Sequence, residues 1–154
     1  MRIRGATAGE AQLLEELQRR SSDIWPQYRD QLAAHPDAIE PSETFIQNRW
    51  VRIAVGDDGT PIGFSVVIPT DGGVHELDGL FVEPGHMGGG VGRALVEDAA
   101  ASARTNGATR LMVTTGPAEG FYERVGFEVV GEDVTRFGPA VRMRRVIDGA
   151  SQRA

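Results

Sequence analysis

The strongest pattern of apolar and polar positions lies between residues 76 and 104, where an apolar strand, a run of glycines and an apolar-striped helix follow one another. We expect the strand over Val74–Val82. We expect the helix over Gly89–Thr105, because its apolar residues recur with the 3.6-residue period of a helix. The residues of that stripe are Val91, Leu95, Val96, Ala99, Ala100 and Ala103. The pattern therefore predicts a glycine loop that leads directly into a helix N-terminus.

The glycine loop holds Gly85, Gly88, Gly89, Gly90 and Gly92. Glycine admits positive φ and lets a ligand approach the backbone closely. The N–H groups at a helix N-terminus have no partner within the helix and attract anions, most often phosphate. The loop thus predicts a phosphate site, although a glycine-rich turn without a ligand would have the same composition.

Two common nucleotide-binding motifs do not match this loop. A Walker-type loop ends in Gly-Lys followed by Ser or Thr, whereas here Gly92 is followed by Arg93. A dinucleotide fingerprint that began at Gly88 or Gly90 would need a small sixth residue, and those positions hold Arg93 and Leu95. The residues at these positions therefore exclude both motifs.

The rest of the chain alternates short strands with helices. Thr7 and Glu10 form a capping box, which predicts a helix from Ala8 to near Arg20. The expected strands are residues 1–5, 51–55, 63–68, 74–82, 109–114, 127–131 and 138–147, and a short helix is expected over Ala118–Val125 with Gly126 as its C-terminal cap. These elements predict an α/β (α+β) fold. Its mixed, mostly antiparallel sheet has about six to seven strands, one parallel pair, and helices on both faces.

Residues 21–48 give the least regular pattern, because X-Pro pairs interrupt it. Large aromatic side chains in and beside this stretch belong either to the core or to the wall of a substrate pocket, and the core is the commoner place for them. They are Trp25, Tyr28, Phe45 and Trp50. Residues 151–154 are expected to form a frayed end.

Composition narrows the class of protein. The chain has 154 residues, which suits one domain over residues 1–154. It has no cysteine, which excludes disulfides and thiolate nucleophiles, and no metal site is expected. The net charge of −6 argues against a nucleic-acid partner and favours cationic small molecules. No signal-like start and no apolar run of membrane-spanning length is visible, so we expect a cytoplasmic protein without a membrane partner.

Two motifs in a fixed order carry a resemblance to a known family. The first is VEPGHMGGGVGRAL at residues 82–95, and the second is FYERVGF at residues 121–127, with a predicted strand between them. Together they resemble the GNAT superfamily of acetyl-CoA-dependent N-acetyltransferases. That family's loop is usually Arg/Gln-x-x-Gly-x-Gly/Ala, and its later segment usually ends Phe-Tyr-x-x-x-Gly-Phe. The resemblance covers residues 76–127.

The resemblance implies that the loop binds the pyrophosphate of coenzyme A through backbone amides. It also implies that the strand before the loop offers backbone groups to the pantetheine arm, with a main-chain N–H of Phe81 or Val82 donating to the thioester oxygen. Met87 stands where the family usually has Arg or Gln, and Thr115 replaces a usual asparagine. The residues expected to bind acetyl-CoA are Leu80, Phe81, Val82, Met87, Gly88, Gly89, Gly90, Val91, Gly92, Arg93, Thr115, Ala118 and Phe121.

The resemblance also implies catalytic residues. Tyr122 stands at the position of the family's general acid, and the unperturbed tyrosine pKa of about 10 suits a donor that stays protonated until the thiolate forms. Glu76 stands where many members have a glutamate that acts as general base. Asp78 shares its strand face, and paired carboxylates would also hold a cationic amine. The alternative interpretations are simple packing for Tyr122 and an exposed strand face for Glu76 and Asp78. His75 faces the other way and is expected to be structural or solvated.

We therefore expect an N-acetyltransferase that transfers the acetyl group of acetyl-CoA to a primary amine of a small molecule by direct attack in a ternary complex. No cysteine is available for an acyl intermediate. The alternatives are a non-catalytic acyl-CoA-binding sensor, an acetyltransferase acting on a protein N-terminus or lysine, and a phosphate-binding domain unrelated to coenzyme A. We expect a monomer or a homodimer paired through the final hairpin.

Overall fold

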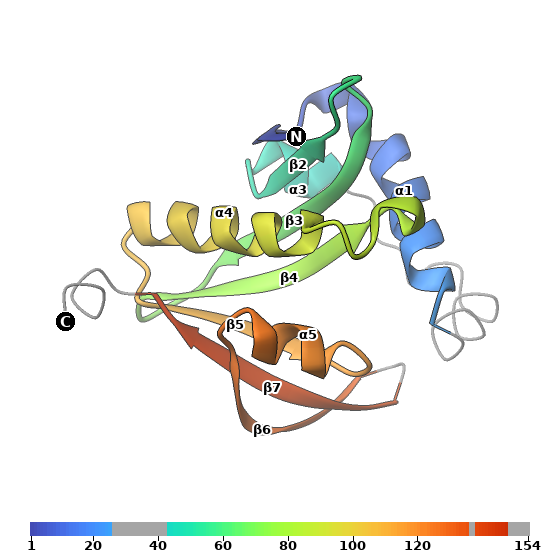
Figure 1. Ribbon diagram of the computed structural model, residues 1–154. Coiled ribbons are helices and arrows are strands. Elements are labelled where there is room, and N and C mark those ends of the chain that lie inside the picture. Colours follow the sequence, from blue (N-terminus) through green and yellow to red (C-terminus); the bar gives the residue numbers. More distant parts are fainter. Residues whose placement is uncertain (26–42, 136–137, 148–154) are drawn as a thin grey trace. The chain divides into compact units, whose positions relative to one another are not determined.

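A computed structural model describes residues 1–25, 43–135 and 138–147, and its strands form a seven-stranded sheet in the order β1-β2-β3-β4-β5-β7-β6 (Figure 1). β4 (Val74–Val82) and β5 (Arg110–Thr115) pair in parallel, and the other recorded pairings are antiparallel. The expected mixed, mostly antiparallel sheet with one parallel pair is confirmed. The expectations for Tyr28 and for the end at 151–154 lie outside the described residues.

The chain divides into two compact units. The first unit comprises Met1–Val66 and Gly79–Leu95, and the second comprises the described residues of Val67–Asp78 and Val96–Ala154. Two strands and a long helix contribute residues to both units. They are β3 (Pro61–Pro69), β4 and α4 (Val91–Thr105).

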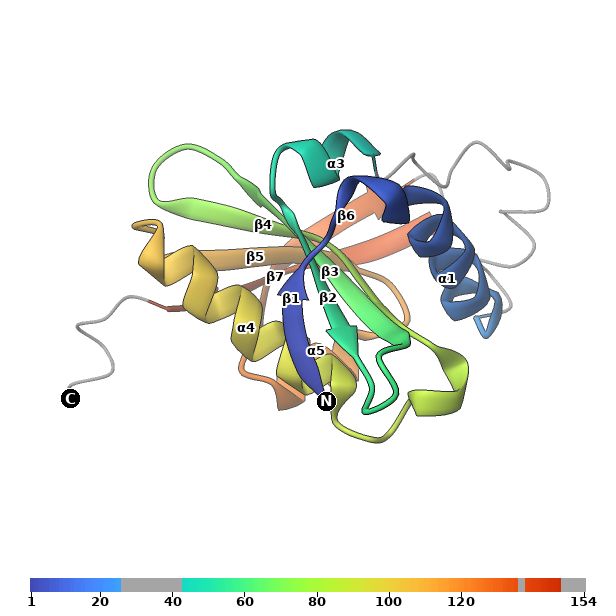
Figure 2. The ribbon, with the colours of Figure 1, turned by 90° about the horizontal axis from the view of Figure 1, so that it is seen from above.

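The first unit begins with β1 (Arg2–Gly5), which lies antiparallel beside β2 (Val51–Val55), as Figure 2 shows. The predicted capping box is present at Thr7 and Glu10. The helix that it opens starts as a 3-10 turn, η1 (Ala8–Glu10), and continues as α1 (Ala11–Asp23), three residues beyond the predicted end at Arg20. Among the described residues before β2, the next helix is α3 (Glu43–Gln47). The ring of Phe45 on α3 lies 6.0 Å from that of Trp50, which follows the helix.

The core of the first unit joins β2, β3, the end of β4 and the start of α4. Its buried residues are Ala54, Ile62, Val91 and Leu95, with Ile3, Leu80 and Val82 packed against them. Gly63 on β3 lets these elements come together, because a Cβ there would stand 2.9 Å from the carbonyl oxygen of Phe81 and 3.1 Å from side-chain atoms of Val91 and Leu95. Cβ atoms essentially never come within 3.0 Å of another heavy atom, so the position requires glycine.

The second unit contains β5, α5 (Glu119–Arg124), β6 (Glu128–Thr135) and β7 (Gly138–Val146). Leu111, Val113 and Met143 are buried in it. The predicted glycine cap of α5 is confirmed, because Gly126 follows the helix with φ of +98°. Both terminal nitrogens of Arg145 bind Glu97 of α4, at 3.0 and 2.7 Å.

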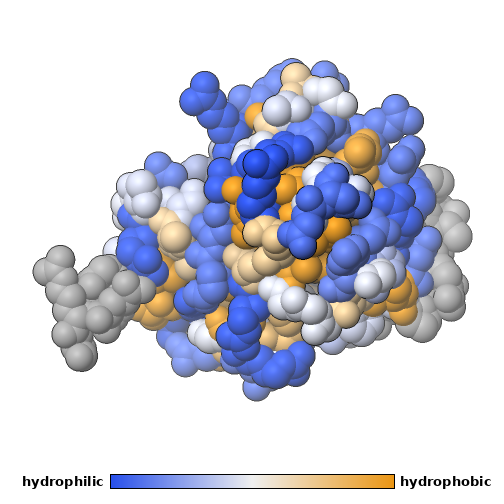
Figure 3. Space-filling model, turned by 45° about the horizontal axis from the view of Figure 1, so that its top comes forward, coloured by the Kyte–Doolittle hydropathy of each residue, from blue (hydrophilic) through white to orange (hydrophobic). Residues whose placement is uncertain are grey.

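β6 is the last strand of the sheet order, so within the described residues one of its edges has no neighbouring strand. Its valines are unusually exposed for apolar side chains, and acidic residues lie among them. The exposed valines are Val129, Val130 and Val134, and the acidic residues are Glu128, Glu132 and Asp133. The face in Figure 3 is largely hydrophilic, with apolar residues gathered near its centre.

Candidate functional site

The glycine loop of the first unit turns sharply into α4. The 3-10 turn η3 (Pro84–His86) comes first, and Gly88 and Gly90 then adopt φ values of +83° and +87°. α4 consequently begins at Val91, two residues later than predicted, because left-handed glycines cannot be part of a right-handed helix. The loop therefore depends on glycine at these two positions.

The start of α4 presents backbone donors at its N-terminus. The Ala94 N–H donates a helical hydrogen bond to the Gly90 carbonyl oxygen at 3.0 Å. The N–H groups of Val91 and Gly92 come before it, in the first turn, where an α-helix has no carbonyl of its own for them to bind. Donors arranged in this way, at the positive end of a helix dipole, fit a diphosphate. The backbone of this loop thus suits the cofactor group that the sequence predicted for it.

A cavity of about 370 Å³ lies beside the loop within the first unit. Met87, which replaces the family's usual Arg or Gln, lines it and is 39% exposed. Apart from His86 and Asp57, the cavity is lined mainly by backbone atoms and apolar side chains. The Asp57 carboxylate accepts a hydrogen bond from the N-terminal ammonium of Met1 at 3.0 Å. The full set of lining residues is Met1, Gly56, Asp57, Ile62, Gly85, His86, Met87, Gly89 and Val91.

The end of β4 precedes the loop. Leu80 and Val82 pack into the core of the first unit, while the Phe81 ring lies 5.0 Å from the Phe64 ring. The N–H of Val82 donates a hydrogen bond to the side-chain oxygen of Ser21 on α1 at 3.3 Å. Of the two amides expected to serve the thioester, the one at Val82 therefore already has a partner in this structure.

In the second unit, Glu76 forms an ion pair that the sequence did not predict. The terminal nitrogens of Arg142 on β7 donate to its two carboxylate oxygens at 2.6 and 2.7 Å, and one of them also donates to Thr114 at 3.1 Å. The bond to Glu76 raises the pKa of Arg142. The two parallel bonds hold the Glu76 carboxylate in one orientation on β4.

Asp78 follows on the same strand. Buried His75 and Leu77 alternate with Glu76 and Asp78 along β4, so both carboxylates lie on one face, as expected. Asp78 is the exposed member of the pair. His75 is buried, not solvated, and burial lowers its pKa.

Tyr122 lies on α5 among aromatic rings. It is 6% exposed, and its ring makes edge contacts with Phe121 and Phe127 at 5.1 and 5.4 Å. The Tyr122 ring is therefore packed between its aromatic neighbours, and such packing is compatible with a role for the phenol. Thr115 is buried at the end of β5, and Ala118 occupies the N-cap position of α5.

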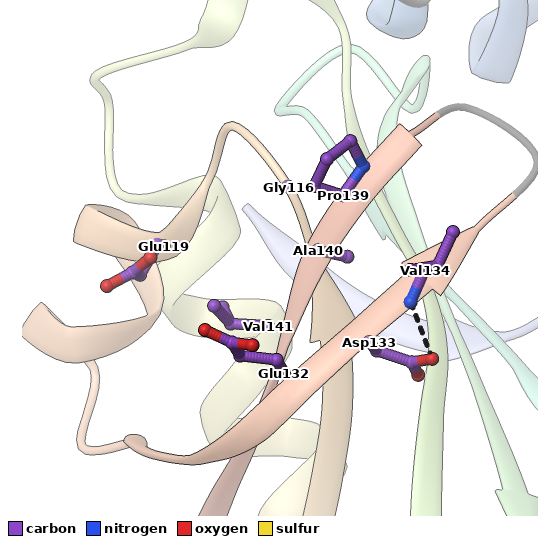
Figure 4. A pocket seen from close by; sticks show the side chains of 8 residues that line it. All are labelled: Gly116, Glu119, Glu132, Asp133, Val134, Pro139, Ala140 and Val141. Atoms are coloured by element: carbon purple, nitrogen blue, oxygen red, sulfur yellow. Dashed lines mark hydrogen bonds between the residues drawn. The ribbon is translucent and has the colours of Figure 1, made fainter.

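An acidic cavity of about 520 Å³ lies in the second unit. Figure 4 shows that Glu132 and Val141 project to the side of the β6–β7 hairpin on which Glu119 of α5 lies, whereas Asp133 and Ala140 project to the other side. The Asp133 carboxylate accepts the Val134 N–H at 2.8 Å. The lining residues are Gly116, Glu119, Glu132, Asp133, Val134, Pro139, Ala140 and Val141. Sequence reasoning missed this site, because it depends on the hairpin register.

The sequence and the fold were compared with known proteins. The profile of the Acetyltransferase (GNAT) family matches residues 11–127. An IAA acetyltransferase of Azospirillum brasilense is 32% identical over 133 residues, which cover 83% of this chain and 80% of that protein. A peptidyl-lysine N-acetyltransferase YjaB of Salmonella typhimurium is 31% identical over 129 residues, 84% of each protein. The crystal structure of a PaiA N-acetyltransferase from Thermoplasma acidophilum in complex with coenzyme A matches with a TM-score of 0.78 at 20% identity, over 94% of this chain and 98% of that one.

These matches, together with the glycine loop and the sheet order, define an acetyl-transferring acyltransferase. The chain belongs to the acetyltransferase (GNAT) family. It is accordingly an enzyme that uses acetyl-CoA. Within the described ranges, no helix has the length and apolarity needed to span a membrane, and no three His, Cys, Asp or Glu side chains gather as a metal site.

Proposed function

We propose that the protein acetylates a primary amine of a small cationic molecule by direct attack on acetyl-CoA in a ternary complex. The observation that carries the choice of acceptor is the acidic cavity, where Glu119 and Glu132 stand on the same side of the β6–β7 hairpin. Two carboxylates there favour a ligand with more than one positive charge. The net charge of −6 adds a weaker attraction of the same sign.

The cofactor residues in this proposal are those of the loop and the strand before it. Acetyl-CoA supplies the acetyl group as a thioester. Backbone N–H groups in the range 87–92 bind its diphosphate, and the backbone of Leu80 to Val82 binds the pantetheine arm. The resemblance also assigns Thr115, Ala118 and Phe121 to acetyl-CoA binding. Met87 adds no charge to the loop, so we expect the grip on phosphate to depend on backbone donors.

The proton transfers involve two side chains. The Asp78 carboxylate accepts a proton from the acceptor ammonium, directly or through water, and leaves the neutral amine to attack. Glu76, held by Arg142, supplies fixed negative charge near the acceptor and is a weaker candidate for the base. The Tyr122 hydroxyl gives its proton to the departing sulfur, and the nitrogen of the adduct loses its second proton, through water, to the resulting phenolate.

An amine-panel assay tests the acceptor. Release of free thiol from acetyl-CoA is followed with polyamines, aminoglycosides, amino acids and a lysine peptide. We expect the highest kcat/KM for acceptors with two or more positive charges. Glu132→Gln should raise KM for them several-fold with little effect on kcat. If Glu132→Gln leaves KM unchanged, the acidic cavity is not the acceptor site.

Tyr122→Phe tests the acid in the same assay. The substitution keeps the ring packing against Phe121 and Phe127, so it removes only the hydroxyl. We expect kcat with the best acceptor to fall by about a hundredfold, as is usual when a positioned proton donor is lost. Unchanged turnover would remove Tyr122 from the mechanism.

A second candidate acceptor is a lysine side chain of a protein. It is favoured by the match to peptidyl-lysine N-acetyltransferase YjaB over 84% of this chain. Faster acetylation of a lysine peptide than of any small amine would select it. Binding of acetyl-CoA without turnover of any amine would instead indicate an acyl-CoA sensor.

A further inference from the structure

The last turns of α1 are bonded to the end of β4 through two consecutive residues of the helix and two consecutive residues at the end of the strand. Arg20 binds Glu83 with two nitrogens, at 2.7 and 2.8 Å. Ser21, the next residue of the helix, accepts the N–H of Val82, the preceding residue of the strand, at 3.3 Å. The helix end is thus fixed to β4 immediately before the glycine loop.

The Val82 amide points away from β3. The N–H of Glu83 donates to the Ile62 carbonyl oxygen on β3 at 2.8 Å. Amide directions alternate along a strand, so the Val82 N–H lies on the opposite edge. The recorded pairing of β4 with β5 covers only Val74 to Glu76. A side chain from α1, and no strand, therefore satisfies this amide.

The bond from Val82 to Ser21 is replaceable. Its length of 3.3 Å exceeds the usual range for N–H···O bonds, so it is weak. Ser21 is only 6% exposed, so water has little access to its hydroxyl. A better-placed carbonyl oxygen on the open edge of β4 would compete for the same N–H, because one N–H makes one well-aligned hydrogen bond.

We infer that the Ser21 hydroxyl holds the Val82 amide while no cofactor is bound and gives it up to a carbonyl oxygen of the acyl-CoA arm. This rests on the proposed function, in which the arm lies along Leu80 to Val82. Ser21 is then a positioning residue that competes with the cofactor and sets its affinity. The Arg20–Glu83 ion pair keeps the helix end in place, so that the hydroxyl regains the amide when coenzyme A leaves.

Isothermal titration calorimetry with coenzyme A on the full chain tests this inference. Ser21→Ala removes the competing acceptor, so we expect Kd to fall by about two- to tenfold, the worth of one ordinary hydrogen bond. Ser22→Ala makes the same change one residue along the helix and should leave Kd unchanged. Thermal unfolding of each variant reports whether the fold is kept.

Three results would separate the possibilities. If wild type binds coenzyme A and folded Ser21→Ala binds it no more tightly, the competition does not exist. If wild type itself binds no coenzyme A, the proposed cofactor site fails, and this inference with it. If Ser21→Ala does not fold, an amide NMR titration of wild type decides: the Val82 resonance should shift strongly, and that of Glu83, which stays bonded to Ile62, should shift little. An unmoved Val82 resonance overturns the inference.

Discussion

The two ends of β4 do different work with the same kind of ion pair. Near its start, Glu76 is bound by Arg142, with side chains 22% and 32% exposed. At its end, Arg20 binds Glu83, and this arginine is 51% exposed. The first pair holds a carboxylate in one orientation. The second holds the end of α1, whose next residue, Ser21, accepts the Val82 N–H. Under the proposed function, we expect the start of β4 to act through its side chains and the end of β4 to act through main-chain donors.

The sharpest test of this comparison is to replace each of the two carboxylates of β4, Glu76 and Asp78, in turn. We expect Asp78→Asn to lower kcat by about a hundredfold, because it removes the proposed base. Glu76→Gln should cost about tenfold at most, because Arg142 already holds both carboxylate oxygens. Steady-state rates across pH measure both, and the acidic limb of the profile should disappear only in Asp78→Asn. The reverse order would make Glu76 the base.

The other end of β4 can be disturbed through the main chain. Gly63→Ala places a methyl group 2.9 Å from the Phe81 carbonyl oxygen, so the strand must shift. We expect a loss of about 2–3 kcal/mol in the free energy of unfolding, typical of overpacking. Chemical denaturation measures this loss. The matched control is Gly9→Ala, because the space around Gly9 is open. Gly59→Ala is a poor control, because Gly59 has a φ of +81°, which alanine rarely adopts. A neutral Gly63→Ala would mean that this end tolerates displacement.

Double-mutant cycles compare the two ion pairs directly. We expect Arg142→Met with Glu76→Gln to give a coupling energy of about 1–2 kcal/mol, because both partners are largely shielded and Thr114 orients the guanidinium. Arg20→Met with Glu83→Gln should give less than about 1 kcal/mol, since Arg20 is mostly in water. Unfolding free energies of the single and double variants supply both numbers. Equal couplings would remove the distinction between the two ends.

We expect the smallest effect on the free energy of unfolding from a change to acidic pH. Bonds from Arg20 lower the pKa of Glu83, and bonds from Arg4 lower that of Glu10 to about 2. Groups with lowered pKa stabilise the fold above their unfolded value of 4.5 and lose that contribution as the pH falls towards the folded value. We expect about 1 kcal/mol to be lost from Glu10 between pH 4.5 and 2, after allowing for solvent screening. Denaturation at each pH should show a shallower decline for Glu10→Gln.

Local patterns were sufficient to predict most of the elements. The bounds of β4 were predicted as Val74–Val82, and Gly126 was identified as the α5 cap, because alternation and turn chemistry are short-range properties. The partners of the site were not predictable in this way. Arg142 lies 66 residues from Glu76, and Ser21 lies 61 from Val82. Such pairs depend on strand register and helix docking, which no local spacing encodes.

The edge strand β6 bears on the tendency of the protein to aggregate. Its exposed valines, Val129, Val130 and Val134, would favour pairing with strands of other chains if no charged residues lay among them. Glu128 is paired with Arg144 at 2.6 Å, but Glu132 and Asp133 put negative charge on the same strand, so two copies that approach each other along β6 are repelled. Substitutions that neutralise these acids in order to change the acceptor preference would also remove the repulsion that prevents β6 from pairing with other chains into fibrils.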